Sequence, residues 1–528
     1  MIMNMEDIIF GENTNCEPAV YLCDSQLMRR MDEDTVRRKN ITFSQLMQSA
    51  AASLHKYITE TNDINDTNGL NKINDVVVIC GKGNNGGDGR ILALLLSDNG
   101  IKVTVIETSE VLTADDLSDE ILQKIFSQSD IIIDAVFGTG FTGELPSNVS
   151  RILKFANSVD IKAKRIAIDI PSGVDANDGT ADINAFRADE TLTFEFIKRG
   201  LVSYPGVEYA GKIVVLPIGF PDVTRELAKE NAKSILLSWE YIKRLLPERR
   251  KNTNKGDFGR LLAVCGSKNM TGAAFLSAMG ALRTGVGLLY LASPVNIIPV
   301  LQAKLNEPVF VPLDFSNSEA YINDTLAELN KNINMYDAVL FGCGIGRGAE
   351  SYMMLDEVIK NHNKTIIFDA DGINTLCGNI DILNEINAHK ILTPHPGEMA
   401  RLCNITVEAV QNNRINIASD FAKKYNCTLV LKGALTVIAD SNGDIYINPT
   451  GNPGMARGGS GDILAGMIAS YAAQGIKAAD AACLGVYLHG LAGDIAKRRL
   501  SELGMLPSDL LDILPEIQSP VFEFKSEK

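Results

Sequence analysis

Short apolar runs alternate with longer helical patterns along most of the chain, and this alternation limits the fold more than any other feature. The runs are apolar throughout, which is typical of strands buried on both faces of a parallel sheet. Helix-like stretches separate them, so we expect helices to cover the sheet. The elements predicted in the first part are strands 76–80, 102–106, 131–137, 165–170, 191–196 and 212–216, and helices 25–39 and 42–59.

The alternation stops once, in the polar segment "PDVTRELAKENAKSILLSWE", where no strand is expected. Such a break is typical of a domain boundary. The alternation restarts in "RLLAVCGS", "GLLYLASP", "AVLFGCGIG", "TIIFDADG", "KILTPHP" and "TLVLKGALTVIAD", and strong helical patterns follow from Asp462 onward. We therefore predict two α/β domains, 1–225 and 241–528, joined by a linker at 226–240.

The composition is that of a globular protein, with 45% apolar and 22% charged residues in a chain of 528. A net charge of −15 argues against non-specific binding to nucleic acid or to anionic lipid. The N-terminus lacks the pattern of a signal peptide, and no apolar run reaches membrane-spanning length. Nine cysteines without a CxxC pair indicate a reducing compartment. We expect a soluble cytoplasmic protein.

The loop "GKGNNGGDGR" matches the G-x-G-x-x-G pattern of dinucleotide-binding folds through Gly81, Gly83 and Gly86. Glu107, at the end of the next apolar run, has the spacing of the acidic residue that binds a ribose hydroxyl. One interpretation is an oxidoreductase that holds NAD as its cofactor. Against it, the glycines are surrounded by polar residues that need partners, and no Tyr-x-x-x-Lys set accompanies them.

Polar residues also follow other predicted strands, where ligands of open α/β sheets bind. Asp134 stands in an apolar strand end, and a buried carboxylate there needs a cation or several donors. With Asn85 and Ser172 it supplies oxygen ligands suited to a hard cation, but a hydrogen-bond network that caps turns fits equally well. Asp169 resembles a general acid or base, although a carboxylate two residues before Pro171 is as often a turn organiser.

In the second domain, Gly458, Gly459 and Gly461 lead into a helix that is expected to begin near Asp462. Several N–H groups and the helix dipole then converge on one point, which suits a phosphate being transferred. Asp462 has the place of a base for an attacking hydroxyl, or it only stabilises its own helix N-terminus. The chain has no P-loop motif, and Lys432, just beyond an apolar run, is a candidate partner for phosphate.

Two further strand ends carry polar groups. "LTPHPGEMARL" places His395 and Glu398 after one of them, and the histidine either contacts a ligand or satisfies the backbone of a turn. "FDADGIN" supplies Asp369, Asp371 and Asn374, which are candidates for orienting water, magnesium or substrate.

Four segments of the first domain, "CGKGNNGGDGR", "IIIDAVFGTGFTGE", "AIDIPSGVDANDGT" and "ADETLTFEFIKRGLVSYPGVEYAGKIVVLPIGFP", resemble in order and spacing the NAD(P)H-hydrate epimerase domain, over residues 21–222. The resemblance implies a Rossmann-like fold, interconversion of the R and S hydrates of NADH and NADPH, and a potassium ion held by Asn85, Asp134 and Ser172. It makes Asp169 the acid/base that touches the hydrate. The other hydrate-binding residues that it implies are Asn84, Asn85, Gly86, Gly87, Asp88, Gly138, Thr139, Gly140, Phe141, Thr142, Gly143 and Glu144. The segment "LMQSAA" lacks an acidic residue common in this family, which puts the substrate lid or a dimer contact in doubt.

The second domain resembles the ribokinase-like NAD(P)H-hydrate dehydratases over residues 255–500. The matching segments are "NKGDFGRLLAVCGSKNMTGAAFLSAMGALRTGVGL", "FGCGIG", "TPHPGE", "LKGALT" and "NPGMARGGSGDILAGMI". By this resemblance, Ala273, Gly344, His395 and Asp462 contact the hydrate. The residues that it implies for the adenine nucleotide are Lys432, Gly433, Ala434, Leu435, Thr436 and Gly461. Cys343 replaces a proline common in the family, a change expected to alter loop stiffness more than chemistry.

Together the resemblances imply a bifunctional repair enzyme that epimerises the hydrate and dehydrates its S form at the expense of ADP, giving AMP and phosphate. ADP is the favoured donor, although no motif excludes ATP, and phosphoryl transfer implies Mg²⁺. The expected partners are the NADH and NADPH hydrates (NADHX and NADPHX) and ADP, without nucleic acid or membrane, in a homo-oligomer. A sugar or vitamin kinase, and a first domain that only binds ligand, are the alternatives.

Overall fold

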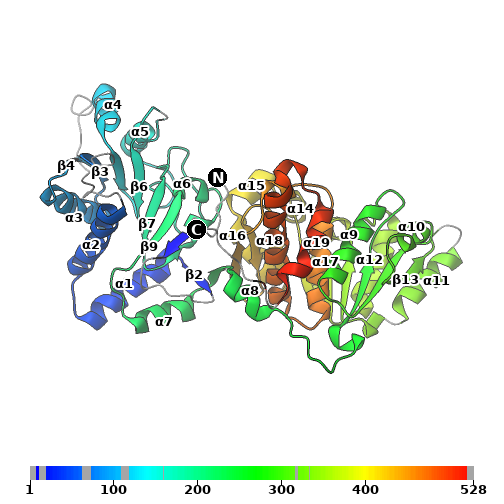
Figure 1. Ribbon diagram of the computed structural model, residues 1–528. Helices are drawn as coiled ribbons and strands as arrows, with labels where there is room; N and C mark the ends of the chain where they lie inside the picture. Colours follow the sequence, from blue (N-terminus) through cyan, green and yellow to red (C-terminus); the bar gives the residue numbers. More distant parts are fainter. Residues whose placement is uncertain are drawn as a thin grey trace. The chain divides into compact units, whose positions relative to one another are not determined.

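The computed structural model describes residues 8–10, 19–61, 73–108, 118–158, 160–315, 319–331, 333–519 and 522. The chain separates into two compact units, Met3–Leu236 and Leu237–Lys528 (Figure 1). Among the described residues, no helix combines the length and the apolar character needed to cross a bilayer. The start of the chain, for which we predicted no signal peptide, lies mostly outside the described residues.

The first unit is built on a parallel sheet with the strand order β1-β9-β7-β6-β5-β3-β4. All six predicted strands are present, although β5, β6 and β7 each end two residues earlier than predicted. Asp134 accepts a hydrogen bond from the Val136 amide, which turns the chain after β5. Asp169 and Glu195, which follow β6 and β7, have left-handed φ angles of 65° and 56°. The strands are β1 (Ile8–Phe10), β3 (Asp75–Cys80), β4 (Lys102–Glu107), β5 (Ile131–Ala135), β6 (Lys164–Ile168), β7 (Glu190–Phe194) and β9 (Lys212–Leu216).

Helices cover both faces of this sheet, because successive residues of each buried strand point to opposite sides. In β3, Val76 and Val78 join one apolar cluster with α1, α2, α3 and α7, whereas Val77 and Ile79 join another with α4 and α5. The predicted α/β sandwich is thus confirmed. Its helices are α1 (Ser25–Lys39), α2 (Phe43–Thr61), α3 (Asn84–Asp98), α4 (Asp119–Gln128), α5 (Ser147–Ala156), the short α6 (Val207–Ala210) and α7 (Asp222–Asn231).

Three short strands lie outside this sheet. β2 (Val20–Cys23) pairs with β8 (Ile197–Lys198) in parallel and with β10 (Ser234–Leu236) in antiparallel orientation. The expectation that 221–240 contains no strand was therefore wrong. A three-residue strand leaves no period in the sequence, and β10 forms because β2 supplies its hydrogen-bond partners.

The second unit has the strand order β13-β12-β11-β14-β15-β16-β17-β18-β19, parallel up to β17 and antiparallel beyond it. The segment "TLVLKGALTVIAD" forms a hairpin of two strands, because Gly433 and Leu435 turn the chain with φ angles of 138° and 51°. The strands are β11 (Arg260–Val264), β12 (Leu288–Pro294), β13 (Val309–Leu313), β14 (Ala338–Phe341), β15 (Thr365–Phe368), β16 (His389–Leu392), β17 (Thr428–Leu431), β18 (Thr436–Ala439) and β19 (Ile445–Asn448).

The central helix of this unit, α17 (Ser460–Ala473), begins two residues before the predicted start and is buried along most of its length. It packs closely on α9 (Thr271–Arg283), because a Cβ at Gly466 would lie 2.0 Å from the Ser277 carbonyl oxygen. This contact fixes the N-terminus of α17 above the strand ends. The other helices are α8 (Trp239–Leu245), α10 (Ile298–Gln302), α11 (Glu319–Asn330), α12 (Ala349–Asn361), α13 (Asp371–Leu376), α14 (Pro396–Cys403), α15 (Val407–Asn412), α16 (Arg414–Lys424), α18 (Ala478–Gly504) and α19 (Pro507–Ile517).

Candidate functional sites

The glycine loop after β3 packs so tightly that Gly81 and Gly86 have no room for a side chain. A Cβ at Gly86 would lie 1.9 Å from the Gly81 carbonyl oxygen, and one at Gly81 would lie 2.0 Å from that of Val136. Glu107, which fits the dinucleotide fingerprint, forms an ion pair of 2.6 Å with Arg90, and Arg90 also donates to the Gly81 carbonyl. The acidic residue therefore holds the loop together.

Asn85, Asp134 and Ser172 come together at the carboxyl ends of β3, β5 and β6. The completely buried Asp134 carboxylate accepts hydrogen bonds from the Ser172 hydroxyl and amide, both at 2.7 Å, and from the Val136 amide at 3.1 Å. Burial still raises its pKa to about 6. The Asn85 amide group donates to the Phe137 carbonyl at 2.8 Å, and its buried Oδ1 has no hydrogen-bond partner within the described part of the chain.

Asp169 is held by a lysine that sequence reasoning did not identify. The buried Lys198 ammonium group donates to Asp169 Oδ1, to the Phe194 carbonyl at 3.0 Å and to the Thr193 hydroxyl at 3.1 Å. A lysine within the largely apolar "FEFIK" was the available signal. Asp169 therefore faces the site as one member of a buried ion pair.

Two further carboxyl groups lie near this pair. Burial, with repulsion from Asp169 and Asp32, raises the pKa of Asp88 to about 8. Burial also raises the pKa of Asp32, in α1, to about 7, although the charge of Lys198 acts in the opposite direction. Asp32 was not predicted, because nothing in its own helix marks it.

The loop of residues 138–144 approaches Asn85 and Asp169 at its first residue, Gly138. A Cβ at Gly138 would lie 3.5 Å from the Asn85 side chain and 3.9 Å from Asp169. Thr142, Gly143 and Glu144 are exposed, whereas Phe141 is buried in the apolar core with its ring 5.2 Å from that of Phe137. Phe141 therefore anchors the loop in this core.

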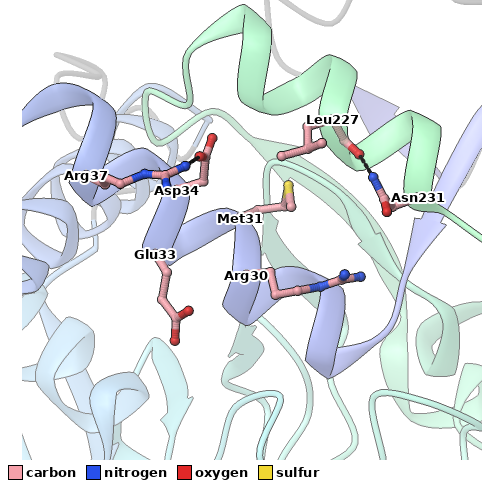
Figure 2. Close-up of a pocket in the computed structure, with 7 residues that line it drawn as sticks. All are labelled: Arg30, Met31, Glu33, Asp34, Arg37, Leu227 and Asn231. Atoms are coloured by element: carbon pink, nitrogen blue, oxygen red, sulfur yellow. Dashed lines mark hydrogen bonds and ion pairs between the residues drawn. The ribbon is translucent and has the colours of Figure 1, made fainter.

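A separate hollow lies between α1 and α7 (Figure 2). Its one buried carboxylate, Asp34, accepts hydrogen bonds from Arg37, Arg38 and the Thr224 hydroxyl, so Asp34 joins the two helices. None of the predicted site residues lines this hollow, which is bounded by Arg30, Met31, Glu33, Asp34, Arg37, Leu227 and Asn231.

In the second unit, the predicted lysine, two carboxylates and the α17 N-terminus converge. Lys432 donates to Asp369 at 2.8 Å, and Asp369 also accepts from the Thr393 hydroxyl at 2.6 Å. A Cβ at Gly461 would lie 3.4 Å from the Lys432 ammonium nitrogen. The charge of the lysine therefore lies against the first turn of α17, where free N–H groups also attract anions.

Asp462, in that first turn, titrates far from its ordinary range. Burial first, and then repulsion by Asp369, raise its pKa to about 7, while the charge of Lys432 opposes the shift. Ligand atoms of Asp462, Asp369 and Cys343 lie within 4.8 Å of one another, and the Cys343 thiol is 3.6 Å from Asp369 Oδ2. The expectation that Cys343 mainly affects loop stiffness was therefore incomplete, because its thiol lies among the carboxylates of the site.

His395 performs the turn role that the sequence left open. Its Nδ1 accepts hydrogen bonds from the amides of Gly397 at 3.0 Å and Glu398 at 3.3 Å, so it caps α14. Burial, followed by the charges of Lys432 and Arg401, lowers the pKa of His395. In this neutral form Nε2 carries the proton, and it lies 3.5 Å from Oε1 of the buried Glu398 carboxylate.

The turn of residues 432–436 is supported by an arginine that was also missed. The buried Arg414 guanidinium group donates to the carbonyls of Leu431 at 3.0 Å and Lys432 at 3.3 Å. On the other side of the site, a Cβ at Gly344 would lie 2.7 Å from that of Ala273, so these two predicted residues are neighbours.

Comparison with known proteins identifies a family for each part of the chain. A family model described as NAD(P)H-hydrate dehydratase matches residues 261–516, and one described as YjeF-related protein N-terminus matches residues 44–200. The bifunctional NAD(P)H-hydrate repair enzyme of Moorella thermoacetica is 37% identical over 466 residues, which cover 84% of this chain and 87% of that protein. The chain belongs to the bifunctional NAD(P)H-hydrate repair enzymes.

Other members of this family of repair enzymes match along similar lengths. The Dictyoglomus turgidum repair enzyme is 32% identical, with 94% of this chain and 97% of that protein covered, and the Escherichia coli one is 33% identical, with 84% and 85% covered. The ADP/ATP-dependent NAD(P)H-hydrate dehydratase of Bacillus subtilis, co-crystallised with ATP and Mg²⁺, is 31% identical and aligns with 53% of this chain and 96% of its own, at a TM-score of 0.46. By the two family matches, the second unit has the ribokinase-like fold of a dehydratase domain and the first has the Rossmann-like fold of its family.

Proposed function

We propose that the first unit interconverts the R and S hydrates of NADH and NADPH, and that the second converts the S form back to the reduced dinucleotide while ADP becomes AMP and phosphate. The observation that carries this proposal is the convergence of Asp462, Lys432 and the α17 N-terminus near the predicted hydrate contacts. A base, a cation and an anion-binding helix end are the groups that phosphoryl transfer to a hydroxyl requires.

In the first unit, the proposed reaction exchanges the hydroxyl between the two faces of one ring carbon. The ring nitrogen expels the hydroxyl, which leaves as water after it takes a proton, and a water that adds to the opposite face releases a proton. Asp88, with a pKa of about 8, is protonated at neutral pH and suits the donor role. The Asp169 carboxylate, held by Lys198, suits the acceptor role. No atom is gained or lost in the cycle.

Potassium fits the buried group of Asn85, Asp134 and Ser172. The unpartnered Asn85 Oδ1, the Asp134 carboxylate and the Ser172 hydroxyl offer oxygen atoms only, with the Phe137 carbonyl next to them. An alkali cation there would neutralise Asp134 and keep the loops after β3 and β5 together. The proposed hydrate contacts in this unit remain those of the glycine loop and of residues 138–144.

In the second unit, the hydroxyl oxygen of the hydrate attacks the terminal phosphorus of ADP, and AMP leaves. Asp462 accepts the proton that this hydroxyl loses. The bond between carbon and the phosphorylated oxygen then breaks, and a proton lost from the neighbouring carbon restores the ring double bond. Lys432 and the N–H groups of Gly461 and its neighbours stabilise the transferred phosphoryl group. Mg²⁺ would supply charge neutralisation on the phosphates, and the Asp369 carboxylate would be an oxygen ligand for it beside the nucleotide and water.

The turn of residues 432–436 is the proposed nucleotide site, and Ala273, Gly344, His395 and Asp462 are the proposed hydrate contacts. The decisive assay supplies pure S hydrate with ADP or ATP separately and follows the absorbance of reduced nicotinamide. Recovery with ADP that is lost in Asp462→Asn supports the assignment. No recovery with either nucleotide in the wild type contradicts it, and phosphorylation of a sugar or vitamin instead would favour a kinase.

We further propose a cytoplasmic location, domain limits at 225 and 241, and a homo-oligomer. The eight described cysteines are all free thiols, which suits a reducing compartment. Phe43, half exposed at the start of α2, offers an apolar residue to a subunit contact. Light scattering of the purified chain measures the oligomeric state directly.

A further inference from the structure

A cavity of about 410 Å³ in the second unit is not explained by the nucleotide turn. It lies beyond the carboxyl ends of β11, β12, β13 and β14, and residues that follow each of these strands line it. Cys265, Asn296, Asp314 and Ile345 represent the four strand ends in its wall. Its size is within the range of small-molecule sites.

This position is the switch point of the sheet. From β11 the chain runs to β12 and β13 on one side, and it then returns to β14 on the other side of β11. Connections leave in opposite directions at such a point and open a crevice between the two strand ends, where open α/β sheets bind ligands. The proposed nucleotide turn follows β17, and β15 and β16 separate it from β14. The cavity and the nucleotide turn therefore belong to different parts of the sheet.

Contacts connect the cavity to Asp462. Gly266 lines the cavity, and its amide donates a hydrogen bond to the Cys343 carbonyl at 2.8 Å. The Cys343 thiol in turn lies within 4.8 Å of a ligand atom of Asp462. Ile345, also in the wall, directly follows Gly344, a proposed hydrate contact. These contacts place the wall of the cavity next to the group around Asp462, and the proposal below requires that the hydrate extend from there past Gly344.

We propose that this cavity holds the adenosine end of the hydrate, an inference that rests on the proposed dehydratase function. The substrate is a dinucleotide, so its reacting ring carries a diphosphate, a second ribose and adenine that need a place. ADP is proposed to bind beside Lys432. The switch point is therefore the place that remains for the adenosine end of the hydrate. Between the two, Gly344 has a φ angle of 69° and brings backbone without a side chain into the path of the diphosphate, whereas the amides of Gly342 and Gly346 already donate to the Val264 carbonyl and to Asp371.

The charges in the wall select the form of the hydrate. Asp314 and Glu350 line the cavity against one cation, Lys268. A carboxylate beside a ribose accepts a hydrogen bond from its 2′-hydroxyl and repels a 2′-phosphate. The cavity therefore favours the hydrate of NADH over that of NADPH. Glu350 is an exposed residue in the first turn of α12, so its charge can be changed without disturbing the core.

The first test fills the cavity from its edge. Asn296→Trp replaces an exposed lining residue, and Val300→Trp adds the same bulk at an exposed α10 residue outside the lining. We expect Asn296→Trp to raise the KM for the S hydrate at least fivefold and to leave the KM for ADP unchanged, with no change in Val300→Trp. An unchanged hydrate KM, or a raised ADP KM instead, overturns the inference. An inactive wild type would instead contradict the dehydratase function itself.

The second test reverses one charge. We expect Glu350→Lys to raise the ratio of kcat/KM for the NADPH hydrate to that for the NADH hydrate at least tenfold. Glu408→Lys, in the first turn of α15, makes the same exchange in a helix that does not line the cavity and should leave the ratio unchanged. A ratio unaltered by Glu350→Lys overturns the selectivity. Melting temperatures equal to that of the wild type establish that the variants are folded.

Discussion

Replacing Asp369 with Asn should move the acidic limb of the dehydratase pH profile to lower pH. Asp462 accepts a proton only when it is ionised, so kcat/KM for the S hydrate should fall tenfold per unit below its pKa of about 7. Repulsion from Asp369 is one cause of that high pKa. Its removal, which also frees the charge of Lys432 to act on Asp462, lowers the pKa.

The size of the shift follows from the distance between the two carboxylates. Their nearest ligand atoms lie within 4.8 Å, and two unit charges at that distance repel by about 3.5 kcal/mol at an effective dielectric constant of about 20, which corresponds to about 2.5 pH units. Asp462 is partly open to solvent, so screening reduces the effect, and we expect a fall of about one to two units. Burial, the larger cause, remains in the variant and keeps the pKa above its ordinary range.

The assay records initial rates of reduced-nicotinamide recovery from S hydrate and saturating ADP between about pH 5 and 9. Asp381→Asn, which removes an exposed carboxylate away from the site, is the matched control and should keep the wild-type profile. A limb that stays near pH 7 in Asp369→Asn would refute the coupling, and with it the assignment of that limb to Asp462.

Three more perturbations test the first unit. Lys198→Met leaves the Asp169 carboxylate buried without its cation and should lower the free energy of unfolding, measured by urea titration, by about 3–5 kcal/mol. The double variant Lys198→Met/Asp169→Asn should regain most of this loss. An equal loss of stability in the single and the double variant would refute the pairing. Asn85→Ala should abolish stabilisation of the protein by K⁺ in thermal melts, whereas persistent stabilisation by K⁺ would place the ion elsewhere. Gly86→Ala forces a Cβ to within 1.9 Å of a carbonyl oxygen and should cost about 3 kcal/mol or more of stability, whereas Gly83→Ala, with open space around its Cβ, should cost under about 1 kcal/mol.

Much of the fold was predictable because its signals are local. Buried parallel strands are apolar throughout, so their positions could be read from the sequence to within two residues in the first unit. α1 was predicted with its observed ends, because Asp24 caps its start and Asn40, at a φ angle of 53°, ends it. The short strands β2, β8 and β10 were not predicted, because two to four residues are too few to establish a period.

The candidate sites were predictable in their residue types more than in their contacts. The glycine loops and the carboxylates after the strands were recognised because polar residues interrupt apolar patterns there. Lys198, Asp32, Arg414 and the role of Cys343 were missed, because each acts through a partner distant in the sequence. Lys432 and Asp369, for example, are 63 residues apart and meet only because β15 and β17 lie on either side of β16.

By itself, the sequence determined the two α/β domains, the places where the chain turns, and the groups able to carry acid, base and phosphate chemistry. These follow from interactions between near neighbours, such as helix caps, glycine conformations and apolar periodicity. Only the tertiary structure decided that Lys198 pairs with Asp169, that Asp369 raises the pKa of Asp462, and that β14 returns beside β11 to form the switch-point cavity. Strand order depends on the packing of whole layers, and the shifts in pKa depend on burial that no local pattern records.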